Sequence, residues 1–365
     1  MLSVIGIGQA GGSVADNFAS KGIDSLVINY SQKDLDSCEN INDEKKLKLV
    51  GTEGVGKQRD YAIKLMNQNW ESTLNFIKNH VSQPSSELIF VVFSTAGGTG
   101  SGISPLITDM LINELDNKTI VTCPILPDIN ESTIGHLNTL NCLKELSSLD
   151  ICILPIDNNN FSHLGSKNKV YSYVNESFST LILNIILHTE MYSKHGNFDQ
   201  KDLITVFGTK GFANISHVNI SNIKEGFTLT SEYVSEQIVK SWNKSLFTKP
   251  DTDKIIRYGF IFDAQEQLMQ YINISSILSN FSNQPLDVFE GYYHQNKGDV
   301  YSILTGLQFN KERLKEMENK TLQQSEILSE VISAPHSIQF KQTNIQIKKQ
   351  PQKKNISDIL KKYQK

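Results

Sequence analysis

Short apolar runs separated by polar and glycine-rich stretches mark out the first half of the chain. The run at residues 88–93 is uninterrupted and is typical of a buried strand. After residue 102 the apolar positions recur in steps of three and four up to residue 115, which predicts a helix. A strand, a glycine-rich turn and a helix are therefore expected in succession. Other strand-like runs occupy residues 1–7, 25–28, 120–125 and 150–155.

The second half begins with a long periodic segment. Apolar residues between 169 and 194 repeat with helical spacing over about seven turns. A helix with so much apolar surface is expected to be buried between two domains. Strand-like runs at 203–208, 255–262, 287–293 and 300–308, with helical stretches at 232–246 and 268–281, suit a small α+β domain.

The last segment combines a charged helix with a basic tail. Residues 311–332 predict a helix docked through one face and ended by Pro335. Residues 341–365 carry eight lysines against one aspartate, whereas the whole chain has a net charge of −4. The segment 336–355 has few large apolar residues and is expected to be flexible. Ile356, Ile359, Leu360 and Tyr363 then form a short amphipathic motif, which would bind a partner or remain a solvated lysine tail.

The amino-acid composition disfavours several classes of protein. A chain of 365 residues is long enough for two domains. The four cysteines form no CxxC pair and no signal peptide is evident, which fits a reducing cytoplasm. No apolar run approaches the length of a membrane span. The acidic balance of the whole chain disfavours a purely electrostatic nucleic-acid binder.

Residues 93–102, FSTAGGTGSG, are the most informative stretch. Their glycines allow consecutive backbone N–H groups to point into one space, and the start of the following helix adds partial positive charge. This combination predicts a phosphate site, against the alternative of an ordinary tight turn.

Two other glycine-rich segments offer alternatives. Gly6, Gly8 and Gly11 satisfy GxGxxG, but the second strand ends in Asn29 without the acid that holds a ribose in dinucleotide sites. Residues 51–57 almost spell a phosphate-binding P-loop, but Gln58 stands where that motif needs Ser or Thr. NAD binding and a P-loop are therefore both disfavoured, and an NAD-dependent oxidoreductase is kept as the alternative from another class of protein.

The stretch AGGTGSG resembles the signature loop of the tubulin and FtsZ superfamily, with Ala96 in place of the first glycine. The resemblance implies an α/β, tubulin-like fold in which a parallel Rossmann-type GTPase sheet and a long central helix are followed by a smaller α+β domain, a terminal helix and a basic tail. The implied boundaries are a GTP-binding domain at 1–168, the central helix and catalytic loop at 169–202, an activation domain at 203–308, the terminal helix at 309–334 and the tail at 335–365.

The same resemblance implies GTP or GDP with Mg²⁺ as the ligand, with Gln9 near the metal. At the fifth loop, Glu131 stands where FtsZ proteins have a ribose-binding glutamate, but their arginine is Gly135 here. Tyr171 and Asn175 lie one helical turn apart, where family members stack and hydrogen-bond the guanine. The expected nucleotide contacts are Gly8, Gln9, Ala10, Gly12, Asn29, Thr52, Gly54, Ala96, Gly97, Gly98, Thr99, Gly100, Ser101, Pro127, Glu131, Asn158, Tyr171 and Asn175.

Directly after the long helix, Asn197, Asp199 and Asp202 match the family's seventh loop, N-x-D-x-x-D. An Asp at a helix start is also a good cap, so each alone has a structural alternative. Together they are expected to be catalytic, orienting a water for attack on a phosphoryl group. The resemblance implies that they act on the nucleotide of the neighbouring subunit in a head-to-tail filament.

A short, divergent chain with a charged terminal helix and basic tail looks like the TubZ group of plasmid and phage tubulins. That resemblance implies filaments in the cytoplasm of a bacterial host that segregate DNA through an adaptor protein on a centromere-like site, bound through the tail. An FtsZ-like division protein and a non-hydrolysing structural protein, with Ala96 and Gly135 as signs of decay, are the alternatives that keep the same fold.

Overall fold

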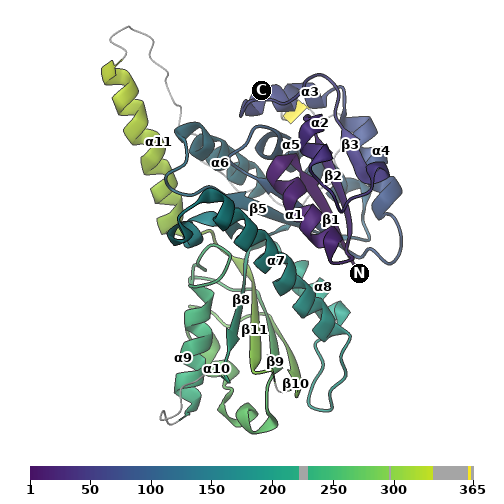
Figure 1. The fold of residues 1–365 in the computed structure, drawn as a ribbon. Helices are drawn as coiled ribbons and strands as arrows, with labels where there is room; N and C mark the ends of the chain where they lie inside the picture. Colours follow the sequence, from purple (N-terminus) through teal and green to yellow (C-terminus); the bar gives the residue numbers. More distant parts are fainter. Residues whose placement is uncertain (222–228, 296, 332–360, 363–365) are drawn as a thin grey trace.

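The structure is a computed structural model that describes residues 1–221, 229–295, 297–331 and 361–362 (Figure 1). The expected helix end at Pro335 and the amphipathic motif of Ile356, Ile359, Leu360 and Tyr363 lie outside the described residues, as does the tail apart from Lys361 and Lys362.

The described strands form one continuous sheet in the order β10-β9-β11-β8-β6-β5-β4-β1-β2-β3. Its amino-terminal half, from β6 to β3, is parallel throughout. Parallel sheets are covered on both faces, which explains the uninterrupted apolar runs in the sequence. The strands of this half are β1 (Leu2–Ile7), β2 (Asp24–Asn29), β3 (Lys46–Lys48), β4 (Leu88–Ser94), β5 (Thr119–Leu126) and β6 (Cys152–Ile153), and the short β7 (Ile156–Asp157) also pairs with β5.

Alternate residues of these strands enter two cores. Val4, Phe90 and Val92 pack on one face with Phe18 of α1 (Gly8–Ser20), close to α2 (Gln32–Asp36). Ile5 and the other alternate residues pack on the opposite face, beneath four helices. Those helices are α3 (Arg59–Met66), α4 (Trp70–Val81), α5 (Thr99–Glu114) and α6 (Thr133–Leu146), and the 3₁₀ segments of this half are η1 (Asp43–Lys45) and η2 (Asn158–Leu164).

The carboxy-terminal half continues the sheet with mixed pairing. β8 joins β6 in parallel through two residue pairs, β11 runs antiparallel to β8 and β9, and β10 is parallel to β9. Its elements are α8 (Gln200–Phe207), β8 (Gly211–Asn219), α9 (Ser231–Trp242), β9 (Arg257–Asp263), η3 (Glu266–Tyr271), α10 (Ile274–Leu278), β10 (Asp287–Tyr293), β11 (Asp299–Leu307) and α11 (Lys311–Val331). In Figure 1, α11 leaves this half and lies against α6.

The long helix α7 (Lys167–Thr189) crosses between the two halves, as its apolar pattern predicted. Its buried residues share one core with the amino-terminal strands and with Ile215 and Ile303 of the second half. Phe178 lies at the centre of this contact. Its ring centroid is 5.4 Å from that of Phe18, 6.2 Å from that of Phe90 and 5.9 Å from that of Phe247.

Several expected elements are wrong or displaced. Residues 203–208 were expected to be a strand but lie in α8, and β8 begins only at Gly211. The stretch 268–281 is not one helix, because η3 ends at Tyr271 and α10 begins at Ile274. The central helix ends at Thr189 rather than near 194, and only two residues of 150–155 are in β6.

Replacing Phe178 with Ala should lower the free energy of unfolding by about 3–5 kcal/mol, because it empties a fully buried ring site shared by three other aromatic rings. Urea denaturation followed by circular dichroism measures this change. Tyr192→Ala is the matched control, since that ring is 88% exposed and its removal should change stability by less than about 0.5 kcal/mol. Equal effects of the two substitutions would contradict the central role of Phe178.

Candidate nucleotide-binding site

A cavity of about 670 Å³ opens where the parallel strands β1, β2, β4 and β5 end and where α1, α5 and α7 begin. Ligands of open α/β sheets bind at this edge, and the volume lies in the range of small-molecule sites. The cavity gathers residues from position 7 to position 175. Those that the sequence analysis had singled out are Gly8, Gln9, Ala10, Asn29, Gly54, Ala96, Gly97, Gly98, Thr99, Gly100, Pro127, Glu131, Asn158, Tyr171 and Asn175.

The starts of α1 and α5 give one end of the cavity the character of an anion site. Neither first turn is capped by a side chain within the described part of the chain, and neither contains an acidic residue. Their first backbone N–H groups therefore retain the partial positive charge of a helix start. Residues of both first turns line the cavity, which suits a phosphate chain.

Two glycines allow these turns to lie this close. Gly8 has a φ of +74°, and a Cβ atom there would lie 3.2 Å from the backbone N of Gly100. A Cβ atom on Gly98 would lie 2.5 Å from Val55 Cγ2 and 3.0 Å from the backbone N of Gln58. The signature turn is thus packed between the first loop and the loop of residues 51–58. Any larger residue at either position would force the loops apart.

Lys57 is held over this end of the cavity in a strained conformation. Its φ is +64°, and it is the sole residue other than glycine with a positive φ in the described ranges. Asn138 Nδ2 donates hydrogen bonds to the carbonyl oxygens of Lys57 (3.0 Å) and Gly97 (3.1 Å), which ties the loop to the signature turn. The Lys57 ammonium donates to Ser132 Oγ at 3.3 Å and forms no ion pair among the described residues.

The opposite end of the cavity is lined by Tyr171 and Asn175 from the first turns of α7. Tyr171 is 40% exposed, and its hydroxyl donates to Glu131 Oε1 at 3.4 Å. Burial, and then the neighbouring carboxylate of Glu131, raise the pKa of this hydroxyl, so it stays protonated. The aromatic ring and the amide thus lie on one helix face, as their spacing predicted.

Three expected contacts do not line the cavity, each for a local reason. Gly12 is a packing residue, because a Cβ atom there would lie 3.0 Å from Val27 Cγ2. Thr52 Oγ1 donates to the carbonyl of Gly54 at 2.8 Å. The fully buried Ser101 hydroxyl donates to the carbonyls of Gly97 and Gly98. Ser101 and Thr52 therefore hold their loops in shape instead of facing the cavity.

Asn197, Asp199 and Asp202 are also outside the cavity. Asp199 and Asp202 form a reciprocal capping box at the start of α8: Asp202 N donates to Asp199 Oδ1 at 2.9 Å, and Asp199 N donates to Asp202 Oδ2 at 3.0 Å. Asn197 Oδ1 accepts from Ser193 N at 2.6 Å. The structural alternative of a helix cap is thus present in the structure. Burial raises the pKa of the Asp202 carboxyl, and the charge of Asp199 acts in the same direction.

Several polar residues of the cavity were not predicted from the sequence. Lys57 and Glu53 lie in the P-loop-like segment of residues 51–57, from which only Thr52 and Gly54 were expected to contact the nucleotide, so that motif was an available signal. Glu53 is paired with Lys48 at 3.0 Å. No pattern in the sequence pointed to the others, Ser13, Ser31, Asp34, Lys167 and Asn168.

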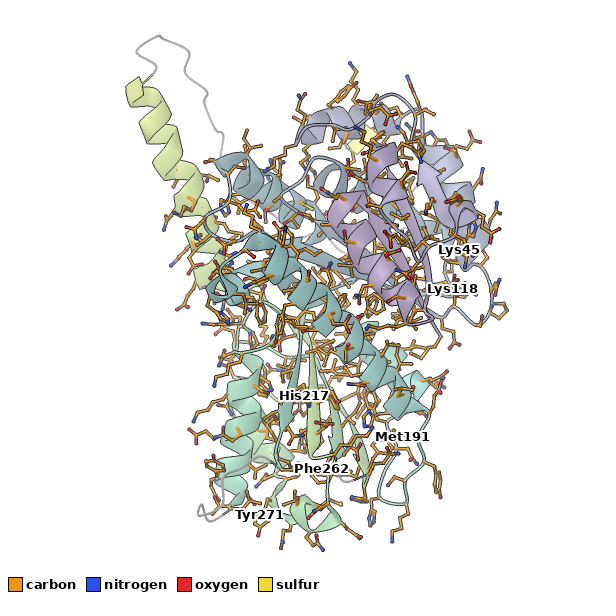
Figure 2. The ribbon with its side chains drawn as sticks, viewed as in Figure 1. Lys45, Lys118, Met191, His217, Phe262 and Tyr271 are labelled. Carbon is orange, nitrogen blue, oxygen red and sulfur yellow. The ribbon has the colours of Figure 1, made fainter. Side chains whose placement is uncertain are left out.

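Two of the described histidines outside the cavity are paired with carboxylates. His188 Nε2 lies 3.2 Å from Asp263 Oδ2 in the core. His217, labelled on the second half of the molecule in Figure 2, has its Nε2 2.8 Å from Asp299 Oδ1. Within the described ranges no three His, Cys, Asp or Glu side chains are grouped as a metal site requires. No described helix combines the length and apolar character needed to cross a bilayer.

Comparison with known proteins identifies the domain that carries this cavity. Residues 1–166 match the model of the Tubulin/FtsZ family, GTPase domain. Over most of its length the chain is similar to the tubulin-like protein CetZ of Pyrococcus abyssi, with 23% identity covering 89% of this chain and 94% of that one. It is also similar to the tubulin-like protein TubZ of Clostridium botulinum C phage, with 25% identity covering 88% and 84%.

Solved structures confirm the tubulin-like fold. The crystal structure of Clostridium botulinum phage c-st TubZ has a TM-score of 0.71 with 22% identity and covers 89% of this chain and 98% of its own. The GTPγS-form protofilament of Bacillus thuringiensis serovar israelensis TubZ has a TM-score of 0.74 with 17% identity and covers 90% and 94%. The fold expected from the signature loop is therefore correct, and similarity extends to both TubZ and CetZ proteins.

Removing the Lys57 ammonium should weaken binding of GTP by about tenfold to a hundredfold, the usual loss for a hydrogen bond to a charged group. Lys57→Ala and Lys57→Gly form a matched pair. Both remove the charge, but only glycine relieves the positive φ and should be more stable than the alanine variant by about 1 kcal/mol. Titration of a fluorescent GTP analogue into dilute protein measures the affinity. Wild-type affinity in both variants would leave Lys57 without a role in the site.

Proposed function

We propose that this protein binds GTP in the cavity, hydrolyses it to GDP and phosphate, and polymerises head to tail into filaments. The observation that carries the proposal is the separation of two sets of residues along α7. Tyr171 and Asn175 line the cavity near the start of the helix, and Asp199 and Asp202 follow its end. A helix of 23 residues is about 34 Å long, so one molecule presents its cavity and its acidic loop at distant places.

Base recognition is assigned to the α7 end of the cavity. The Asn175 amide can donate to O6 of guanine and accept from its ring N–H or amino group, a pattern that adenine does not match. The half-exposed Tyr171 ring offers a flat apolar face for a purine. The phosphates would then extend toward the uncapped starts of α1 and α5.

The magnesium ion expected with GTP is a hard cation that binds oxygen ligands. Gln9 and Asp34 offer such oxygens along the cavity wall, and Asp34 is fixed by a 3.0 Å hydrogen bond from Asn29 Nδ2. These donors fit Mg²⁺ bound together with a nucleotide. When bound, the ion would neutralise charge on the phosphate oxygens.

Hydrolysis is proposed to require two subunits. The acidic loop of one subunit meets the γ-phosphate of the next, where the carboxylates of Asp199 and Asp202 orient a water molecule and accept its proton. The water oxygen bonds to the γ-phosphorus as the bond to the β-phosphate oxygen breaks, which leaves GDP and phosphate. The raised pKa of Asp202 suits a proton acceptor. Such a heterologous contact repeats along an open filament.

GTPase activity per molecule should therefore rise steeply above a threshold protein concentration and be lost in Asp199→Asn. Asparagine is as good a helix cap as aspartate but cannot take a proton, so the start of α8 should persist. Asp199→Ala is the paired variant, which should lose the activity and also about 1 kcal/mol of stability. Phosphate release against protein concentration gives the rates, and light scattering follows assembly. If Asp199→Asn filaments released phosphate at the wild-type rate, Asp199 would act only as the cap of α8.

We further propose that the filaments segregate plasmid or phage DNA in the cytoplasm of a bacterial host, through an adaptor protein on a centromere-like site. Similarity to a phage TubZ and the lysine-rich segment 341–365 support this role. The second candidate is a CetZ-like or FtsZ-like cytoskeletal role without DNA, which the similarity to archaeal CetZ proteins favours.

Deleting residues 336–365 distinguishes the two roles. The truncated protein should polymerise with GTP as the full chain does, because the described cavity and acidic loop lie outside the deletion. It should lose capture of the adaptor bound to its DNA site, because the deleted segment carries the lysines. Filament co-sedimentation with adaptor and labelled DNA measures both properties. Undiminished capture would contradict the DNA role assigned to the tail.

A further inference from the structure

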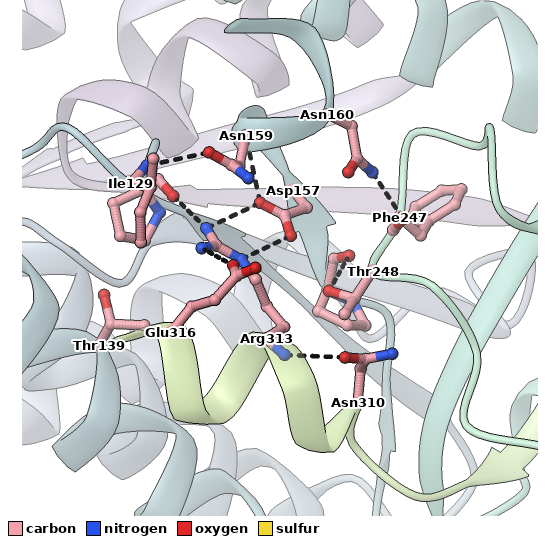
Figure 3. A network of polar contacts seen from close by, with 12 residues as sticks. Ile129, Thr139, Asp157, Asn159, Asn160, Phe247, Thr248, Asn310, Arg313 and Glu316 are labelled. Atoms are coloured by element: carbon pink, nitrogen blue, oxygen red, sulfur yellow. Dashed lines mark hydrogen bonds and ion pairs between the residues drawn. The ribbon is translucent and has the colours of Figure 1, made fainter. Parts of the chain in front are cut away.

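We propose that Arg313 of α11 is a positioning residue for the nucleotide cavity. It fastens two cavity-lining segments to the terminal helix, so that nucleotide binding and the docking of α11 are coupled. The proposal rests on the function proposed above for the cavity, and it concerns contacts between residues that lie far apart in the chain (Figure 3).

The guanidinium of Arg313 is buried and makes four hydrogen bonds to three residues. Its Nε donates to Asp157 Oδ2 at 2.9 Å, and its Nη2 donates to Asp157 Oδ1 at 3.1 Å and to the carbonyl oxygen of Pro127 at 2.5 Å. Its Nη1 donates to Glu316 Oε2 at 3.2 Å. Arg313 is 5% exposed and Asp157 is 2% exposed. A fork of this geometry is specific for a carboxylate, and lysine cannot reproduce it.

The partners of Arg313 belong to the wall of the cavity or adjoin it. Pro127 lines the cavity, and Asp157 directly precedes the lining residue Asn158. The segment that contains Pro127 and the segment that contains Asp157 are also joined to each other by hydrogen bonds. Asp157 Oδ1 accepts from Asn159 N at 3.1 Å, and Asn159 Oδ1 accepts from Ile129 N at 3.1 Å. Arg313 thus closes a ring of hydrogen bonds that holds the backbone on both sides of this wall.

Arg313 also lies where α11 begins and docks on α6. Arg313 N donates to Asn310 Oδ1 at 2.8 Å at the start of α11. One turn later Met317 packs against Leu143 of α6. Breaking a buried ion pair leaves an uncompensated charge, so displacing Arg313 from Asp157 would be costly for both the helix and the cavity wall. A ligand that needs the ordered wall therefore favours the docked helix, and by reciprocity the docked helix favours the ligand.

The test compares Arg313→Met with Leu143→Ala in the full chain. Leu143→Ala removes part of the packing of α11 on α6 but keeps the partners of Arg313, so α11 should stay docked through Arg313. We expect Arg313→Met to weaken GDP binding by about tenfold or more and Leu143→Ala to change it by less than about twofold. Binding is measured by fluorescence at a temperature where circular dichroism shows both variants folded. Arg313→Lys should fall between wild type and Arg313→Met.

Amide hydrogen exchange supplies a readout that a purely structural role would not move. GDP should slow exchange in residues 311–322 of wild type and Leu143→Ala, but not of Arg313→Met. If Arg313→Met does not fold, the double variant Asp157→Asn with Arg313→Gln removes both charges together and is tested in its place. Equal GDP affinity in the arginine and leucine variants, or no effect of GDP on exchange in wild type, would overturn the coupling. A wild-type protein that binds no GDP would overturn the proposed function itself.

Discussion

The packing of α7 against both halves of the sheet is the contact on which the rest of the structure depends. One apolar helix covers the parallel strands and also shares its core with β8 and β11. Phe178 alone meets aromatic rings from α1, from β4 and from the segment after α9. Because the helix is continuous from Lys167 to Thr189, its length separates the Tyr171 end of the cavity from the acidic loop. This one contact therefore places the cavity and the acidic loop at opposite ends of α7.

The parts that could be predicted from sequence are those fixed by local chemistry. The glycines at 97, 98 and 100 and the uninterrupted strand before them specify a turn with exposed N–H groups, and that turn is where it was expected. The contacts that could not be predicted join distant residues. Arg313 and Asp157 are 156 positions apart, and neither lies in a motif. Only the folded structure shows that α11, which follows the last strand, reaches the wall of a cavity lined by residues of the first half of the chain.

The wrong assignment of α8 has a specific physical cause. Residues 203–208 are rich in β-branched and aromatic side chains, which favour a strand in isolation. The capping box of Asp199 and Asp202 initiates a helix instead, and Leu203, Val206 and Phe207 then fall on one buried face. The carboxylates read from the sequence as catalytic are thus also what starts the helix. The two roles are compatible, since a carboxylate oxygen that accepts one amide retains acceptor capacity toward a neighbouring molecule.

The two departures from the family's motifs, Ala96 and Gly135, are explained by the structure as one adjustment. A Cβ atom on Gly135 would lie 3.3 Å from Ala96 Cβ, so a larger residue at 135 would press on the methyl group at 96. The positive charge lost with the arginine of FtsZ proteins is available from another loop. Lys57 reaches Ser132, whose Oγ accepts from Gly135 N at the start of α6, and thereby brings an ammonium to the same turn. Ala96 and Gly135 thus fit each other in one packed wall of the cavity, beside a lysine whose carbonyl oxygen is held by Asn138.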